Sequence, residues 1–272
     1  MHSKIYTFIF SLFSLLIFFS CTPRNLTVKP DDTVDNTGNT DLLYQKSIIN
    51  TLLAGVYDGE TTFGELKQYG DFGIGTFNEL DGEMVGFDGS FYQIKADGKV
   101  YPVPDSMTTP FAAVTFFESD QVITLSDSIL YPDLCVYIDS LLPTLNLPYA
   151  VRIDGTFRSL KARSVPQQSK PYIPLVEVVK KQPVFSFENE KGSLIGFRLP
   201  EFLKDVNVPG YHFHFITEDK TRGGHLLDCV VIEGKIVIDY TPDLEISLLE
   251  QDAFYQLPLG EDKSNELEKV EK

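Results

Sequence analysis

Three Asp-Gly pairs divide one stretch of the chain into segments short enough to restrict its fold severely. The pairs begin at Asp81, Asp88 and Asp97, within residues 71–103. Asp-Gly is a preferred sequence of tight hairpin turns, because the central residues of such turns need positive φ. The chain must therefore reverse direction several times over a short distance. This pattern predicts short strands in an antiparallel meander.

Other segments add longer strands and a few helices. A helix is predicted over residues 42–57 from the spacing of apolar residues, and another over residues 132–142. The sequence Thr62-Phe-Gly-Glu65 has the form of a capping box that starts a short helix. Further strands are predicted at 111–117, 149–165, 184–188, 194–198, 211–217, 225–232 and 235–240, with a turn at Glu233-Gly234 between the last two.

These elements predict an α+β protein with mostly antiparallel or mixed β structure. A Pro-rich run at 166–174 has the composition of a linker. We therefore expect two β-rich subdomains, at 42–165 and 166–272, with a few short helices. The second subdomain contains a cluster of histidines.

Composition narrows the classes of function. Apolar residues make up 43% of the chain, with 21 Phe and 13 Tyr, which is typical of a folded globular protein. The formal net charge is −16, and we find no basic patch. Because binding to a phosphate backbone needs clustered Lys and Arg, nucleic acid is not an expected partner.

The first 21 residues read as an export signal. Lys4 precedes an apolar stretch at 5–19, and the segment ends at Ser20-Cys21. This resembles a bacterial lipoprotein signal, in which cleavage precedes the cysteine and lipid is attached to it. Alternatives are an ordinary secretory signal and an uncleaved anchor. We expect an exported protein held by lipid on Cys21 at the periplasmic or cell-surface side of a membrane.

Residues 22–41 are polar and lack apolar periodicity, so they are predicted to form a flexible tether. Two cysteines follow, Cys135 and Cys229, each with apolar neighbours in sequence. They could pair in an oxidising compartment, but we favour buried thiols.

Three of the four histidines lie close together, at His212, His214 and His225, and the fourth, His2, lies in the export signal. Residues i and i+2 of a strand face the same side, about 6.6 Å apart, so His212 and His214 should project together. The polar loop EDKTRGG then returns His225 on the adjacent strand, close to His214. Three imidazoles on one face, with a fourth position open, indicate a catalytic zinc site more than a closed structural one. The alternative is three ordinary polar residues of a strand.

Three segments around these residues resemble bacterial α-acetolactate decarboxylase: YDGETTFGELKQYGDFGIGTFNELDGEMVGFDGSFYQIKADGK, FRSLKARSVPQQSKPY and VPGYHFHFITEDKTRGGH. The likeness extends from about residue 42 to the C-terminus. It implies conversion of (S)-2-acetolactate to (R)-acetoin and CO₂ in acetoin and butanediol metabolism, with Zn²⁺ held by His212, His214 and His225. It also implies a homodimer.

The resemblance also implies the rest of the site. Its Asp-Gly-Glu carboxylate corresponds to Glu83, its Lys-Ala-Arg arginine to Arg163, and its small polar residue in Gly-x-Gly-Thr to Thr76, which would contact the substrate. A glutamate near the end of the family corresponds to Glu271, with Glu266 and Glu268 as close alternatives. In this chain alone, Glu83 would pass for a solvated hairpin residue and Glu271 for part of a charged tail.

The resemblance assigns chemistry to these residues. Arg163 would hold the carboxylate of the substrate or its neighbouring oxygen, since a guanidinium matches such groups. Glu83 or Glu271 would deliver the proton that sets product chirality, and a carboxylate could also ligate the metal. Two other classes stay open: a cupin-like metal-dependent oxygenase, which would need iron and oxygen, and a non-catalytic zinc-binding lipoprotein, which would not turn over acetolactate.

Overall fold

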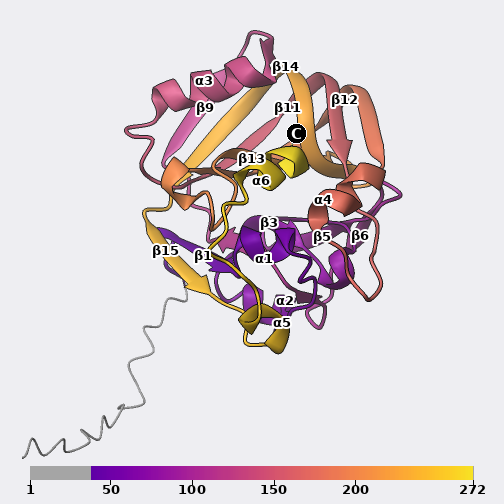
Figure 1. The fold of residues 1–272 in the computed structure, drawn as a ribbon. Helices are drawn as coiled ribbons and strands as arrows, with labels where there is room; N and C mark the ends of the chain where they lie inside the picture. Colours follow the sequence, from indigo (N-terminus) through magenta and orange to yellow (C-terminus); the bar gives the residue numbers. More distant parts are fainter. Residues whose placement is uncertain (1–37, 272) are drawn as a thin grey trace, which may run out of the picture. The chain divides into compact units, whose positions relative to one another are not determined.

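The computed structural model describes residues 38–271 and contains two main β-sheets (Figure 1). The predicted signal segment and most of the predicted tether lie outside the described residues. Among the described residues, no helix is both long enough and apolar enough to cross a membrane. The first sheet has seven strands, in the spatial order β15 (Asp243–Ser247), β1 (Leu42–Lys46), β8 (Ala112–Thr115), β3 (Phe72–Thr76), β4 (Glu83–Phe87), β5 (Ser90–Ile94) and β6 (Val100–Pro102).

The second sheet has six strands, three of which are long. They are β10 (Ile129–Leu130), β14 (Gly223–Tyr240), β11 (Tyr149–Arg163), β12 (Val184–Leu199), β13 (Gly210–Thr217) and β9 (Gln121–Leu125). Because β13 pairs with both β12 and β14, the strands β11, β12, β13 and β14 form a closed circuit. A separate two-stranded ribbon joins β2 (Thr61–Thr62) and β7 (Thr108–Thr109).

The helices are short. They are α1 (Ile49–Leu53), α2 (Phe63–Leu66), α3 (Tyr131–Leu141), α4 (Leu175–Val178), α5 (Asp252–Tyr255) and α6 (Ser264–Glu271), with single 3-10 turns at Asn78–Leu80, Val179–Lys181 and Glu201–Leu203. The mixed, mostly antiparallel α+β class predicted from the sequence is therefore confirmed. So are the meander of β3 to β5, the capping box of α2 and helix α3.

The helix predicted over 42–57 is only partly correct. Its first part is the strand β1, which pairs in parallel with β15 and antiparallel with β8. Leu42, Leu43 and Tyr44 are all buried there, on both faces of the sheet. A strand buried on both faces has no alternation, so its apolar run can imitate helical spacing. Ser47 then adopts φ 65° and the chain turns into α1.

The turn predicted at Glu233-Gly234 is wrong, because β14 runs through it without reversing. The strands predicted at 184–188 and 194–198 are likewise one strand, β12. Beside the position of the predicted turn, Gly155 of β11 pairs with Gly192 of β12 on one side and with Gly234 of β14 on the other. A Cβ on Gly155 would lie 2.5 Å from the Glu233 carbonyl oxygen. The glycines therefore allow the three strands to approach closely, and they interrupt the side-chain pattern without ending the strands.

The two sheets pack against each other through apolar side chains. Ile195 and Phe197 of β12 meet Ile74 and Val85 of the first sheet in one buried cluster. The opposite side of the second sheet encloses another cluster, covered by α3 and containing Phe213 and Phe215. Cys229 is buried in that cluster, Cys135 is half-buried, and both are free thiols.

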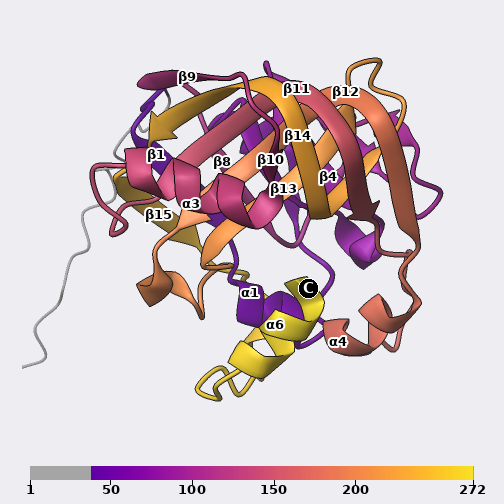
Figure 2. The same cartoon turned by 90° about the horizontal axis from the view of Figure 1, so that it is seen from above.

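The subdomain boundary predicted at 165/166 does not coincide with the boundary between the sheets, since β11 lies in the second sheet with β12 and β14. A third apolar cluster joins α1, α4 and α6, which lie together near one end of the long strands (Figure 2). Leu267 and Val270 are the residues of α6 buried in it. This cluster brings the C-terminal residues close to β13 and β14, the strands that carry the histidines.

Candidate active site

The three histidines lie together, as strand alternation predicts. Phe213 and Phe215 point into the core below β13, so His212 and His214 point to the other face. His214 and His225 are direct partners across β13 and β14. All three imidazoles are buried, and one ring nitrogen from each lies within 4.8 Å of the others.

The ring nitrogens are arranged as metal ligands would be. His212 Nε2 lies 3.1 Å from His225 Nδ1. Two ligands of one tetrahedral ion, each about 2.0–2.1 Å from it, lie about 3.3 Å apart. His214 Nδ1 donates to the Met84 carbonyl oxygen at 2.7 Å, which leaves Nε2 as the lone-pair nitrogen. That Nε2 is buried and has no hydrogen-bond partner among residues 38–271.

Burial keeps these imidazoles neutral. It lowers the pKa of His212 to about 3, with a further contribution from the Arg163 charge. It also lowers the pKa of His214 and His225 well below the usual range. Neutral imidazole is the form that binds metal. The donor set, its spacing and the unpartnered His214 Nε2 therefore fit a cation.

Glu83, Arg163 and Glu271 surround the histidines. Glu83 Oε2 lies 3.6 Å from His214 Nε2. Glu271 Oε2 lies 3.6 Å from His225 Nε2 and 3.9 Å from His212 Nε2. The structure therefore places Glu271, the last described residue, directly beside the histidines.

Arg163 connects the elements of the site. Its Nη1 donates to Glu83 Oε1 at 3.2 Å, and its Nη2 donates to the Val270 carbonyl oxygen at 2.9 Å. Its Nε is buried and has no partner within the described chain. A buried guanidinium with an unused N–H can bind an anionic oxygen of a ligand.

The carboxyls of Glu83 and Glu271 both have a pKa close to neutral pH. Burial raises the pKa of Glu83 to about 7, against the lowering effect of Arg163 and with a smaller contribution from Glu271. Burial also raises the pKa of Glu271 to about 7, and Arg163 opposes it there too. Such groups exchange protons readily near pH 7, as general acids and bases must.

Thr76 lines the same cavity, but its hydroxyl proton already has an acceptor. Thr76 Oγ1 donates to the Gly82 carbonyl oxygen at 2.7 Å. Toward a ligand, the oxygen can therefore only accept a hydrogen bond. Through this hydrogen bond, Thr76 stabilises the Asp81-Gly82-Glu83 turn.

Sequence reasoning missed the residues that hold this turn from the other side. The amide of buried Gln93 donates to the Asp81 carbonyl oxygen at 2.5 Å and to Asp81 Oδ2 at 3.1 Å. Lys95 Nζ forms an ion pair with Asp81 Oδ2 at 2.6 Å. Gln93 lies in β5, and Lys95 directly follows this strand. Neither residue shows a sequence signal, because its role depends on strand register.

A glycine allows Arg163 and His225 to be neighbours. Arg163 and His225 are paired across β11 and β14, and Gly224 precedes His225. A Cβ on Gly224 would lie 2.4 Å from the Arg163 carbonyl oxygen. Any side chain there would separate the strands at the site, so the glycine in TRGGH has a structural reason.

A small cavity of about 40 Å³ contains the site. All seven residues singled out from the sequence line it: Thr76, Glu83, Arg163, His212, His214, His225 and Glu271. The remaining wall is mainly apolar and comes from Ile49, Leu52, Gly75, Leu80, Phe111, Val165, Leu175 and Val270. The cavity therefore combines a buried polar cluster with an apolar enclosure, as ligand sites commonly do.

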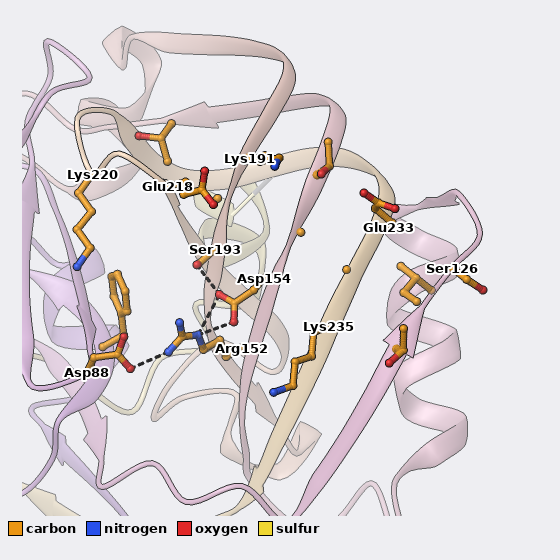
Figure 3. A pocket seen from close by; sticks show the side chains of 18 residues that line it. Asp88, Ser126, Arg152, Asp154, Lys191, Ser193, Glu218, Lys220, Glu233 and Lys235 are labelled. Carbon is orange, nitrogen blue, oxygen red and sulfur yellow. Dashed lines mark hydrogen bonds and ion pairs between the residues drawn. The ribbon is translucent and has the colours of Figure 1, made fainter.

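A larger hollow of about 780 Å³ lies elsewhere, over Gly155, Gly192 and Gly234 of the second sheet. Figure 3 shows Arg152 between Asp88 and Asp154, with Ser193 beside Asp154. Arg152 pairs with both carboxylates, and Ser193 Oγ donates to Asp154. Because Arg152 and both carboxylates already have ion-pair partners in one another, we assign no chemistry to this hollow.

The fold and cavity define a protein with a histidine triad that could bind a metal, and an arginine and two carboxyls reach the same cavity. The family model for alpha-acetolactate decarboxylase matches residues 43–261. The chain therefore belongs to the alpha-acetolactate decarboxylase family, whose members are carboxy-lyases.

Individual relatives agree with this family. The chain is 51% identical over 232 residues to the alpha-acetolactate decarboxylase of Methanosarcina mazei, covering 85% of this chain and 81% of that protein. It is 44% identical over 206 residues to that of Bacillus subtilis strain 168, covering 76% and 81%. A crystal structure of the B. subtilis 168 enzyme superposes with a TM-score of 0.83 at 41% identity, over 85% of this chain and 99% of that one.

Proposed function

We propose that this chain converts (S)-2-acetolactate to (R)-acetoin and CO₂ with a zinc ion as its cofactor. The observation that carries the proposal is the convergence of three neutral histidines, two protonatable carboxyls and one partly unpaired arginine in a single buried cavity. Family membership supports decarboxylation over an oxygenase or a non-catalytic zinc-binding role.

His212, His214 and His225 would hold the zinc. When bound, zinc supplies a Lewis acid that stabilises negative charge on the former ketone oxygen of the substrate. Zinc suits three imidazole ligands with an open fourth position, which supports this ion among the alternatives.

Arg163 binds the substrate carboxylate in this proposal. Its Nε is the unpartnered donor, while Nη1 and Nη2 keep Glu83 and the α6 carbonyl in place. The bond between the carboxylate and the hydroxyl-bearing carbon breaks, and its electron pair remains in an enediolate. The apolar wall excludes water from this intermediate. Thr76 Oγ1 accepts a hydrogen bond from the substrate hydroxyl.

One carboxyl then donates a proton to the carbon that lost CO₂. Glu83 is buried and Glu271 is half-buried, and burial raises the pKa of both carboxyls above the usual range, which favours their protonated forms. Delivery from one fixed side makes a single enantiomer of acetoin. Comparison of Glu83→Gln with Glu271→Gln by the enantiomeric excess of acetoin would assign the donor.

The test is to mix the purified protein with acetolactate and measure acetoin and CO₂. Metal analysis should find close to one zinc per chain in active protein and almost none in a His214→Ala variant, which should be inactive. His214→Ala should still fold, as circular dichroism would show. Zinc-loaded protein that forms no acetoin would refute the activity, and active protein without metal would refute the role of zinc.

Two further proposals concern the whole protein. A homodimer follows from the resemblance to the family, and sedimentation of the purified protein would test it. Export and attachment through lipid on Cys21 follow from the signal-like segment 1–21.

A further inference from the structure

The turn between β3 and β4 has an unusual backbone. Two consecutive residues other than glycine lie in the left-handed region, Glu79 at φ 61° and Leu80 at φ 53°. Side chains are disfavoured there, because Cβ approaches the following carbonyl oxygen. Such a conformation persists only where surrounding contacts fix it, and it is found preferentially at functional sites.

Contacts from two segments, residues 57–59 and the segment containing Gln168, fix this turn. The Asn78 side chain exchanges two hydrogen bonds with the Gly59 backbone, at 2.9 and 2.8 Å. The Glu79 N–H donates to the Tyr57 carbonyl oxygen at 2.8 Å, and the Gln168 N–H donates to the Glu79 carbonyl oxygen at 2.7 Å. The left-handed residues are therefore held rigidly from both neighbouring segments.

The consequence of this conformation is the position of the Leu80 side chain. Leu80 is 2% exposed and packs in the apolar cluster with α1, α4 and α6. It also lines the cavity that contains Glu83, three residues further along the same turn. The hydrogen bond from Thr76 to the Gly82 carbonyl oxygen fixes the part of the turn between Leu80 and Glu83. Leu80 is therefore held at a fixed distance from the Glu83 carboxyl.

We propose that Leu80 is a specificity-determining residue whose side chain packs against the alkyl group on the substrate carbon that bears the carboxylate. This rests on the proposed function. Arg163 and Glu83 form an ion pair in the cavity, so a carboxylate bound by Arg163 brings the carbon that carries it close to the Glu83 turn. Leu80 is the apolar cavity residue contributed by that turn. Its size limits the alkyl group at this carbon.

The test compares kcat/KM for 2-acetolactate and for the homologue with an ethyl group in place of the methyl on the carboxylate-bearing carbon. Leu80→Ala should raise the ethyl-to-methyl ratio of kcat/KM about 10-fold over wild type, within the range for one methylene in an apolar pocket. Leu80→Gly, which suits a left-handed φ, should raise it similarly and replaces Leu80→Ala if that variant does not fold. Leu80→Met keeps the volume and should keep the wild-type ratio.

Leu53→Ala is the matched control, because Leu53 lies in the same apolar cluster, is fully buried and does not line the cavity. It should lower Tm without changing the ratio. An unchanged ratio in active Leu80→Ala or Leu80→Gly protein would overturn the proposal, as would an equal shift in Leu53→Ala. A wild-type protein that yields no acetoin from acetolactate would instead overturn the proposed function, and the role of Leu80 with it.

Discussion

Burial and a neighbouring positive charge shift the pKa of Glu83 in opposite directions. Burial raises the pKa of its carboxyl and Arg163 lowers it, with a result of about 7. Glu83→Gln keeps the size of the side chain and an acceptor for Arg163, but it removes the transferable proton. We expect kcat to fall about 100-fold or more, within the usual range for a general acid, while bound zinc stays at the wild-type level. Glu65→Gln, an exposed carboxyl in the capping box of α2, is the control. Wild-type turnover in Glu83→Gln would exclude a proton-transfer role.

Asp239 should make the stability of the protein depend on pH. It is 2% exposed in β14, and its Oδ2 accepts a hydrogen bond from the Glu118 N–H at 3.3 Å. Burial raises its pKa to about 7, and Asp120 and Asp41 add to this. A raised carboxyl pKa means that the folded protein holds the proton more tightly than the unfolded chain does. The stabilisation is therefore complete below about pH 4 and is lost as pH rises through 7.

Asp239→Asn should remove this dependence, because the amide remains neutral and its oxygen can still accept from Glu118. A pKa raised to about 7 costs the wild type about 2–3 kcal/mol of stability between pH 5 and pH 8.5. Since 1 kcal/mol moves Tm by about 2–4 °C in a chain of this size, we expect the Tm of the variant, relative to wild type, to rise by about 5–10 °C over this interval. Thermal unfolding at both pH values measures this. A difference that stays constant, or that shrinks with rising pH, would contradict a raised pKa of Asp239 in the folded protein.

Among the elements, sequence patterns located strands well and judged their ends badly. The alternation of Phe213 and Phe215 with His212 and His214 correctly predicted that both histidines share one face of β13, because the other face of that strand is core. The Glu233-Gly234 pair has the local chemistry of a turn, yet β14 continues through it. Whether a glycine ends a strand or permits a close approach depends on the strand opposite. Local sequence does not contain that information.

Helix α6 brings the least predictable part of the site into place. Glu271 lies beside the histidines because Leu267 and Val270 pack against α1 and α4, and because Arg163 binds the Val270 carbonyl. Only the family resemblance indicated Glu271 from sequence, since a short charged tail has no local sign of docking. The position of this helix is therefore a tertiary property.

Loosening α6 should impair catalysis more than stability. Leu267→Ala removes one of its two buried side chains, and we expect kcat to fall about 10-fold or more, since small displacements of a catalytic group are costly. Lys269→Ala, an exposed position on the same helix, should leave kcat unchanged. Turnover and Tm should be measured on both. A fall in Tm at unchanged kcat would show that α6 need not be held tightly for Glu271 to act.

At the scale of the whole molecule, the site depends on both sheets and on the C-terminal helix. Glu83 belongs to the first sheet, while Arg163 and the histidines belong to the second. The position of β11 in the second sheet, across the boundary predicted at residue 165, explains why Arg163 reaches His225. Pairing between strands far apart in sequence decides where one sheet ends and the other begins.

The segment before the described residues should anchor the enzyme without taking part in catalysis. Every residue that lines the site lies between Ile49 and Glu271, well beyond the predicted tether. We therefore expect Cys21→Ser to move the protein from the membrane fraction to the soluble fraction, with kcat/KM on acetolactate unchanged. Cys135→Ser, a thiol outside the cavity, should remain with the membrane and serves as the control. Metabolic labelling with a fatty acid should mark wild type and Cys135→Ser but not Cys21→Ser. Membrane retention of Cys21→Ser would favour an uncleaved apolar anchor over lipid, and a soluble wild-type protein would favour an ordinary secretory signal.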